Sequence, residues 1–198
     1  MRVVLNPGHC PLTDPGTIGP TGLRERDVVR EVTLALCPLA TGKIVYEPKR
    51  QGPLGLWTLT RALHNNPADV VVSLHCNSAE GMVHKHECHT IYWTEDPDRG
   101  RAERSRRLAE AIRIHAEGCF AERAIVLTAP YARRRADGST YQLTPGILVR
   151  TAKVVAVLVE LGFLADRHTE AAMRTADWIA RAAVALNAGL RAWTISNS

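Results

Sequence analysis

The stretch Val70-Val71-Val72-Ser73-Leu74-His75 is a β-branched, apolar run that ends in a histidine. A short run of this kind suits a parallel strand that is buried on both faces of a sheet. Similar runs lie at Val3–Leu5, just before Asn6-Pro7-Gly8-His9, and at Val154–Val159, just before Glu160. We therefore predict a sheet of buried parallel strands with a chemically active side chain near the end of each.

Helical periodicity fills the segments between these runs; the first such segment carries Val28, Val29, Val32 and Leu36 on one face. The predicted strands are Arg2–Asn6, Lys43–Tyr46, Ala68–Leu74, Thr90–Thr94, Ile125–Thr128, Tyr141–Leu148 and Val154–Val159, and the predicted helices are Glu25–Cys37, Leu56–His64, Arg101–Glu117 and Thr169–Trp193. Alternating strands and helices indicate an α/β fold, here a three-layer sandwich whose mostly parallel, twisted central sheet is flanked by helices.

Three segments between these elements are irregular. Pro7–Gly22 is rich in Gly, Pro and Thr, and a loop of this length is more often functional than idle. We also expect a loop over Glu80–His89 and a polar turn over Ala132–Thr140, with Asp137-Gly138 at its tip.

The bulk composition limits the class of protein. A chain of 198 residues, 45% of them hydrophobic, fits a single domain, and we find no internal repeat or linker that would divide residues 1–198. The formal charge of +5 favours anionic partners, but no basic helix interleaved with aromatic residues suggests nucleic-acid binding. No apolar run approaches the ~18 residues of a membrane span. We also see no signal peptide, so we expect synthesis in the cytoplasm.

Four side chains with acid/base or metal-binding chemistry stand near these elements. His9, His75 and Glu160 lie at or just past the C-terminal ends of predicted strands, and Glu25 opens the first helix. Ligands of open α/β sheets bind at the carboxyl ends of the strands, so these positions can meet in space. Two histidines and one glutamate form a three-ligand set typical of hydrolytic zinc sites, and a further glutamate can act as the acid/base.

The five cysteines are odd in number and no secretory signal precedes them, so we expect reduced thiols. Cys10 and Cys76 directly follow the two histidines. Because neighbours in a strand point to opposite faces, buried thiols are favoured over additional metal ligands.

With these residues in hand, the chain resembles the zinc-dependent N-acetylmuramoyl-L-alanine amidases of the amidase-3 type, which are cell-wall hydrolases of bacterial autolysins and phage endolysins. The motifs that carry the resemblance run almost from end to end, in the order of the family. They are Asn6–His9 with Asp14-Pro15-Gly16, Gly22–Val28, Leu59–Arg61, Ala68–Asn77 and Val159–Leu164.

The resemblance implies one Zn²⁺ per chain held by His9, Glu25 and His75, with Glu160 as the catalytic acid/base. It implies peptidoglycan as substrate, cut between the lactyl carbonyl of N-acetylmuramic acid and L-alanine of the stem peptide. Asn77 follows His75 closely enough to reach the substrate, although capping of the loop backbone explains it equally well. The chain departs from the family at His9-Cys10-Pro11, where the family has His-Gly-Gly, and in the unusual segment Met82–His89.

Several alternatives stay open. A zinc exopeptidase would need a groove closed at one end, and a non-hydrolytic wall-binding module would not need Glu160. The cluster His84, His86, Cys88 and His89 suits the rim of a substrate groove better than a second metal site. We expect a monomer without a separate wall-binding domain or an autoinhibitory helix. A phage or prophage lysin that reaches the wall or periplasm after release fits this organisation best, and a trimmed, secreted autolysin is the alternative.

Overall fold

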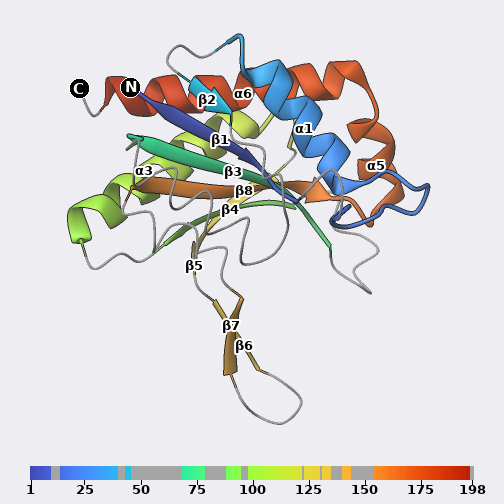
Figure 1. Cartoon of the computed structure of the whole chain (residues 1–198), viewed down its shortest axis with the longest axis horizontal. Helices are drawn as coiled ribbons and strands as arrows, with labels where there is room; N and C mark the ends of the chain where they lie inside the picture. The colour runs from blue at the N-terminus through green and yellow to red at the C-terminus, as the bar shows by residue number, and fades with distance from the viewer. Residues whose placement is uncertain are drawn as a thin grey trace.

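A six-stranded sheet organises the computed structural model of the chain (Figure 1). The structure describes residues 1–9, 14–39, 43–45, 68–78, 88–94, 98–121, 123–129, 131–134, 140–143 and 154–196. Its strands are β1 (Val3–Pro7), β2 (Lys43–Val45), β3 (Val70–Asn77), β4 (Cys88–Thr94), β5 (Arg123–Ala129) and β8 (Val155–Phe163), in the spatial order β2-β1-β3-β8-β4-β5. Every neighbouring pair is parallel except β4 and β8, so the predicted α/β class with a mostly parallel sheet is confirmed.

The pairing of β3 with β8 places two of the candidate residues side by side. His75 lies opposite Glu160 in the register, and on its other edge Glu160 pairs with Thr90 of β4. Both strands continue beyond the predicted ends, Leu74 and Val159, because the ladder extends through a bulge to the pair Asn77 and Phe163. His75 and Glu160 therefore stand inside the strands, whereas we expected them at or beyond the ends.

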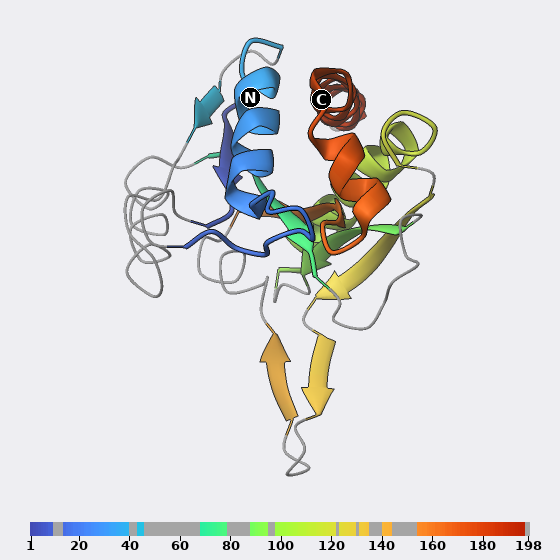
Figure 2. The same cartoon turned by 90° about the vertical axis from the view of Figure 1, so that its right-hand side faces the viewer.

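The described helices lie along one side of the sheet, as Figure 2 shows most clearly. They are α1 (Glu25–Leu36), α3 (Arg99–Ala116), α5 (Arg167–Met173) and α6 (Ala176–Ile195). Their apolar faces share a core with alternate residues of the central strands. Its most deeply buried members include Leu5, Val29, Val32, Leu36, Leu74, Leu108, Ile112, Leu161, Leu186 and Leu190.

The opposite face of the central strands is covered too. Val4, Val71, Ala156 and Leu158 alternate with the residues of that core, and all four are buried. Burial on both faces explains why these strands read as continuous apolar runs in the sequence. The helix predicted over Leu56–His64 lies outside the described residues.

Two boundaries differ from the predictions near the carboxyl terminus and in the middle of the chain. The single helix expected over Thr169–Trp193 is divided, because Thr175 leaves the helical conformation and its side chain caps α6 by accepting from the Trp178 N–H. Strand β4 begins at Cys88, so the expected loop Glu80–His89 ends two residues earlier than we predicted.

A two-stranded antiparallel ribbon projects away from the sheet (Figures 1 and 2). It consists of β6 (Tyr131–Arg134) and β7 (Thr140–Leu143), with Arg133 paired to Tyr141. The polar turn expected over Ala132–Thr140 is therefore wrong at both ends, since cross-strand pairing extends the strands into it. No helix in the described part of the chain is both long and apolar enough to span a membrane.

Candidate metal centre

The end of β1 is built to bring His9 against β3. The Gly8 N–H donates to the Leu74 carbonyl at 2.8 Å, so the backbone stays beside β3 after β1 has ended. A side chain at position 8 would overlap the imidazole of His75, which explains why this position is glycine. His9 itself adopts a left-handed conformation with φ of 68°, which is uncommon for a residue with a side chain. In this conformation the His9 ring lies close to that of His75.

Glu25 is the first residue of α1, and its carboxylate is only 3% exposed. Its Oε1 lies 2.9 Å from His9 Nε2 and 3.1 Å from His75 Nδ1, and it accepts from the Cys76 N–H at 2.9 Å. Its Oε2 accepts from the Thr17 N–H at 2.9 Å. Because the carboxylate lies between the two imidazoles, three residues far apart in sequence form one cluster.

The cluster has the composition and size of a metal site. One potential ligand atom from each of His9, Glu25 and His75 can be chosen so that all lie within 4.8 Å of one another. The two imidazole rings meet edge to face, with their centroids 5.1 Å apart. A single ion can therefore contact two ring nitrogens and one carboxylate oxygen after a small adjustment.

The cluster shifts the pKa values of two of its members. Burial opposes a charge on His9, but the hydrogen bonds and charges of Glu25 and Asp14 outweigh it and raise the pKa of His9 to about 9. Burial likewise opposes the charge of Glu25, yet His75 and His9 hold the pKa of that carboxyl well below its usual range. The site thus stabilises a negative oxygen beside His9, whose proton a metal ion would displace on binding.

Glu160 stands beside this cluster in a different environment. Burial raises the pKa of Glu160 to about 7, against the opposing charge of His75. Its Oε2 is buried and has no hydrogen-bond partner within the structure as described. A buried carboxylate oxygen without a hydrogen-bond partner is costly, which marks this atom as a candidate for a functional role.

Asp14 is a site residue to which we assigned no role from the sequence. Its Oδ2 lies 2.7 Å from His9 Nδ1, and its Oδ1 accepts from the Gly16 N–H at 2.9 Å. Histidines that bind metals commonly hydrogen-bond a carboxylate through their other ring nitrogen, which orients the ring. The sequence signals were an acidic residue inside the Gly/Pro-rich loop, five positions after His9, and its place in the motif Asp14-Pro15-Gly16.

Asn77 lies on the same face of β3 as His75, two residues further on. Its backbone carbonyl accepts from the Leu164 N–H at 3.1 Å, which closes the ladder between β3 and the segment after β8. Its side chain is partly exposed, and no described residue hydrogen-bonds it. Contact with substrate stays a prediction for Asn77.

The cysteine that follows His75 belongs to the core and not to the cluster. Cys76 is 4% exposed and packs among the apolar residues on the helix-covered face of the sheet, and burial raises the pKa of its thiol. The expected buried thiol is thus confirmed for Cys76. Cys10, His84 and His86 lie outside the described residues, and the side chains of Cys88 and His89 are not among those described.

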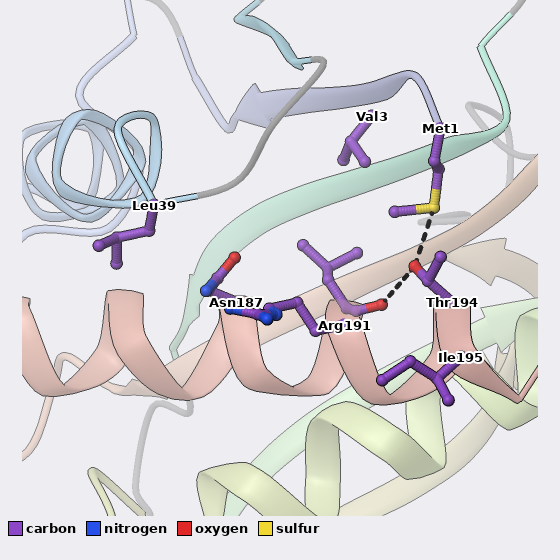
Figure 3. A pocket seen from close by; sticks show the side chains of 8 residues that line it. Met1, Val3, Leu39, Asn187, Arg191, Thr194 and Ile195 are labelled. Carbon is purple, nitrogen blue, oxygen red and sulfur yellow. Dashed lines mark hydrogen bonds between the residues drawn. The ribbon is translucent and has the colours of Figure 1, made fainter.

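A separate pocket of about 410 Å³ lies at the other end of β1 (Figure 3). It is lined by Met1, Val3, Leu39, Asn187, Leu190, Arg191, Thr194 and Ile195. The Thr194 hydroxyl bridges the pocket wall, with the Leu190 carbonyl at 2.8 Å and the Met1 sulfur at 3.2 Å. Because β1 runs from Val3 at this pocket toward His9, the pocket is separated from the metal cluster by the length of the strand.

Comparisons with known proteins agree with this architecture. The family model described as N-acetylmuramoyl-L-alanine amidase (Amidase_3) matches residues 3–192. The amidase from Clostridium difficile 630 is 20% identical with a TM-score of 0.77, and the alignment covers 100% of this chain and 98% of that one. The catalytic domain of CwlV from Bacillus (Paenibacillus) polymyxa var. colistinus is 18% identical with a TM-score of 0.74, covering 98% and 99%.

A third solved structure, the amidase Ami1 from Mycobacterium smegmatis, is 18% identical with a TM-score of 0.75, covering 99% of this chain and 97% of that one. No curated protein sequence matches the chain. The fold is an α/β sandwich with a mostly parallel sheet, and a cluster of potential metal ligands lies at that sheet. The match over nearly the whole chain shows that it belongs to the N-acetylmuramoyl-L-alanine amidase family, which are peptidoglycan hydrolases.

Proposed function

We propose that this amidase is zinc-dependent, that His9, Glu25 and His75 hold one zinc ion, and that Glu160 is its acid/base. One observation carries the proposal. Two imidazoles and a carboxylate converge within 4.8 Å beside a second carboxylate whose buried Oε2 has no partner among the described residues.

The residues present fit a zinc ion. Two histidines and one glutamate are a ligand set of hydrolytic zinc enzymes, in which the fourth position is left to water. The orphaned oxygen of Glu160 supports the same assignment, because a water molecule held at the fourth position would supply its missing hydrogen bond. When bound, zinc acts as a Lewis acid and lowers the pKa of water from ~15.7 to ~7.

Glu160 performs the proton transfers in this proposal. Its carboxylate accepts a proton from the attacking water and then donates it to the nitrogen of the leaving alanine, so that the amine departs uncharged. A carboxyl whose pKa lies near neutrality suits both steps, because it can lose and regain a proton at little cost. A bound cation would lower the pKa of Glu160 from this raised value, and so favour the ionised carboxylate that the first step needs.

The other carboxylates orient the site. Glu25 holds the two histidines on either side of one oxygen, and Asp14 fixes the ring of His9 through Nδ1. The substrate bond is the amide between the lactyl group of N-acetylmuramic acid and L-alanine. No covalent intermediate is required, because water is the nucleophile.

Digestion of purified sacculi, together with chelation, tests this function. We expect new alanine amino termini, loss of hydrolysis after exhaustive chelation, and recovery when zinc is added. Free amino acids released from peptides would indicate an exopeptidase, and wall that is bound but intact would indicate a binding module. Full hydrolysis by protein shown to be free of metal would refute the zinc assignment.

A further inference from the structure

A second buried carboxylate, far from the metal cluster in sequence, holds the segment that leads into Glu25. Glu170 lies in α5 and is 0% exposed. Both of its oxygens accept from the Thr21 N–H, at 2.9 and 3.1 Å, and its Oε1 accepts from the Leu23 N–H at 3.0 Å. Figures 1 and 2 both show α5 beside the segment that precedes α1.

That segment is continuous with the metal cluster. Residues 17–24 form a small closed unit, in which the Gly19 N–H donates to the Leu23 carbonyl and Ile18 pairs with Arg24. At the end of this unit the Glu25 N–H donates to the Thr17 carbonyl at 2.8 Å, and the Thr17 N–H donates back to Glu25 Oε2 at 2.9 Å. The position of the Glu25 carboxylate therefore depends on the position of the segment.

The contact between Glu170 and the segment is close on both sides. A Cβ at Gly19 would lie 2.6 Å from Glu170 Cδ and 2.9 Å from the Leu164 carbonyl oxygen, so only glycine fits there. On the outer side, Arg174 Nη2 donates to the Thr21 carbonyl at 3.0 Å and the Thr21 hydroxyl at 2.8 Å, and lies 3.2 Å from Glu170 Oε1.

The charge on Glu170 is needed for these contacts. Burial opposes ionisation, but the N–H groups of Leu23 and Thr21, together with Arg174, hold the pKa of Glu170 below its ordinary value. The Thr21 and Leu23 N–H groups both donate to the carboxylate of Glu170. If this side chain lost its charge, at least one of these buried N–H groups would face a weaker acceptor.

Helix α5 is in turn fixed to the strand that carries Glu160. Asp166 caps α5 by accepting from the Thr169 N–H at 2.8 Å, and the Leu164 N–H just before it donates to the Asn77 carbonyl. Glu170 thus joins the segment that presents Glu25 to the chain that follows β8.

We infer that Glu170 is a positioning residue for the metal centre: by clamping residues 17–24 it sets the position of Glu25 and hence the affinity for zinc. The inference rests on the zinc site of the proposed function. Glu170 touches neither the cluster nor the substrate bond, and it acts only through the segment it holds.

Zinc affinity of Glu170→Gln, measured by competition with a chelator on the full chain, tests this inference. We expect zinc binding to weaken by about 10-fold, the lower end of the ~10–100-fold loss seen when a group bonded directly to a metal ligand is removed, because Glu170 acts one step further out. Hydrogen exchange at the Thr21 and Leu23 amides should accelerate in the same variant. The control is Leu186→Ala, which opens a cavity in the hydrophobic core beneath α6 and does not alter residues 17–24. This variant should keep wild-type zinc affinity.

Two further variants approach the same contact from other sides. Arg174→Met removes the exposed partner and should weaken zinc binding even if Glu170→Gln fails to fold. Gly19→Ala adds a methyl group that has no room beside Glu170 and the Leu164 carbonyl, and it should weaken zinc binding where the variant folds. Zinc affinity equal to wild type in these variants, or in a folded Glu170→Gln, would overturn the inference. A wild type that binds no zinc would instead refute the proposed function, and this inference with it.

Discussion

Glu25 and Glu160 are both glutamates, but their carboxyl groups have different environments within one site. Two imidazoles and two backbone N–H groups surround Glu25, and they keep its carboxyl ionised. Glu160 is buried beside the same cluster, its Oε2 has no hydrogen-bond partner among the described residues, and burial raises the pKa of this carboxyl to about 7. Such a separation of pKa values supports the proposed roles, with Glu25 as the anionic ligand and Glu160 as the proton carrier.

Glu160→Gln should separate metal binding from chemistry. The amide is nearly isosteric but cannot accept a proton, so we expect zinc content and fold to be kept while turnover falls by ~10²–10⁴-fold. Turnover on a defined muropeptide and elemental analysis of the same sample measure both effects. Glu31→Gln, an exposed change on α1, is the control, and near-normal turnover of Glu160→Gln would show that another residue is the base.

Asp14→Asn should weaken zinc binding without removing a ligand. The amide can no longer hold His9 through a charged hydrogen bond at Nδ1, so we expect ~10–100-fold lower zinc affinity. Chelator competition measures it, with Asp27→Asn as a control, because Asp27 is exposed and contacts Arg26 outside the cluster. An unchanged affinity would show that Asp14 only shapes the loop through Gly16.

The metal-free protein should lose stability as the pH rises from 6.5 to about 9. Folding raises the pKa of His9, so the stability that its proton contributes is full below pH 6.5 and is lost as the pH passes through the folded value. The raised pKa of Glu160 acts in the same direction between pH 4.5 and about 7. Glu25 acts oppositely: its lowered pKa contributes stability above pH 4.5 that is lost in acid.

Urea unfolding of chelated protein across this range measures the effect, and His9→Gln should flatten the part above pH 6.5. The affinity for zinc should show the reverse trend and increase as the pH rises, because zinc binding displaces the His9 proton. A chelated wild type whose stability is constant from pH 6.5 to about 9 would contradict the assigned His9 environment.

At the scale of elements, periodicity predicted most of the helices and strands but not where all of them stop. The apolar stripe through Ala172, Ala176 and Ile179 continues across α5 and α6, so it predicts one helix. The break depends on one local interaction, the cap that Thr175 makes with the Trp178 N–H. Similarly, the extension of β3 and β8 past His75 and Glu160 depends on their mutual pairing and not on either sequence alone.

Thr175→Ala should destabilise the protein by about 1 kcal/mol, because the first turn of α6 loses its side-chain cap. Urea unfolding monitored by circular dichroism measures this. The matched control is Thr194→Ala, since the Thr194 hydroxyl bonds the Leu190 carbonyl inside the same helix and caps nothing. Equal stabilities of Thr175→Ala and wild type would mean that packing of Trp178 alone positions the start of α6.

At the scale of the molecule, the described residues contain a single cluster that could hold a metal, His9, Glu25 and His75. We expect about one zinc ion per chain. Replacing His84, His86, Cys88 and His89 together should leave that number unchanged, whereas His75→Ala should remove most of the zinc. Elemental analysis decides this, and two ions in the wild type that fall to one in the quadruple variant would establish a second site.

The sequence by itself determined the class of fold and the candidate residues for the site. Apolar runs that are buried on both faces are visible as runs, and His9, Glu25, His75 and Glu160 stand in motifs next to them. These features are local, because a few neighbouring residues are enough to predict a buried strand and to identify a reactive side chain.

Only the tertiary structure decided how those residues act on one another. The different pKa values of Glu25 and Glu160, the contact of Asp14 with His9, and the contact of Glu170 with residues 17–24 arise between segments brought together by the fold. Burial, hydrogen bonds and nearby charges set a pKa, and for Glu25 and Glu170 the main partners lie about 50 to 150 residues away along the chain. No local pattern in the sequence records such partners.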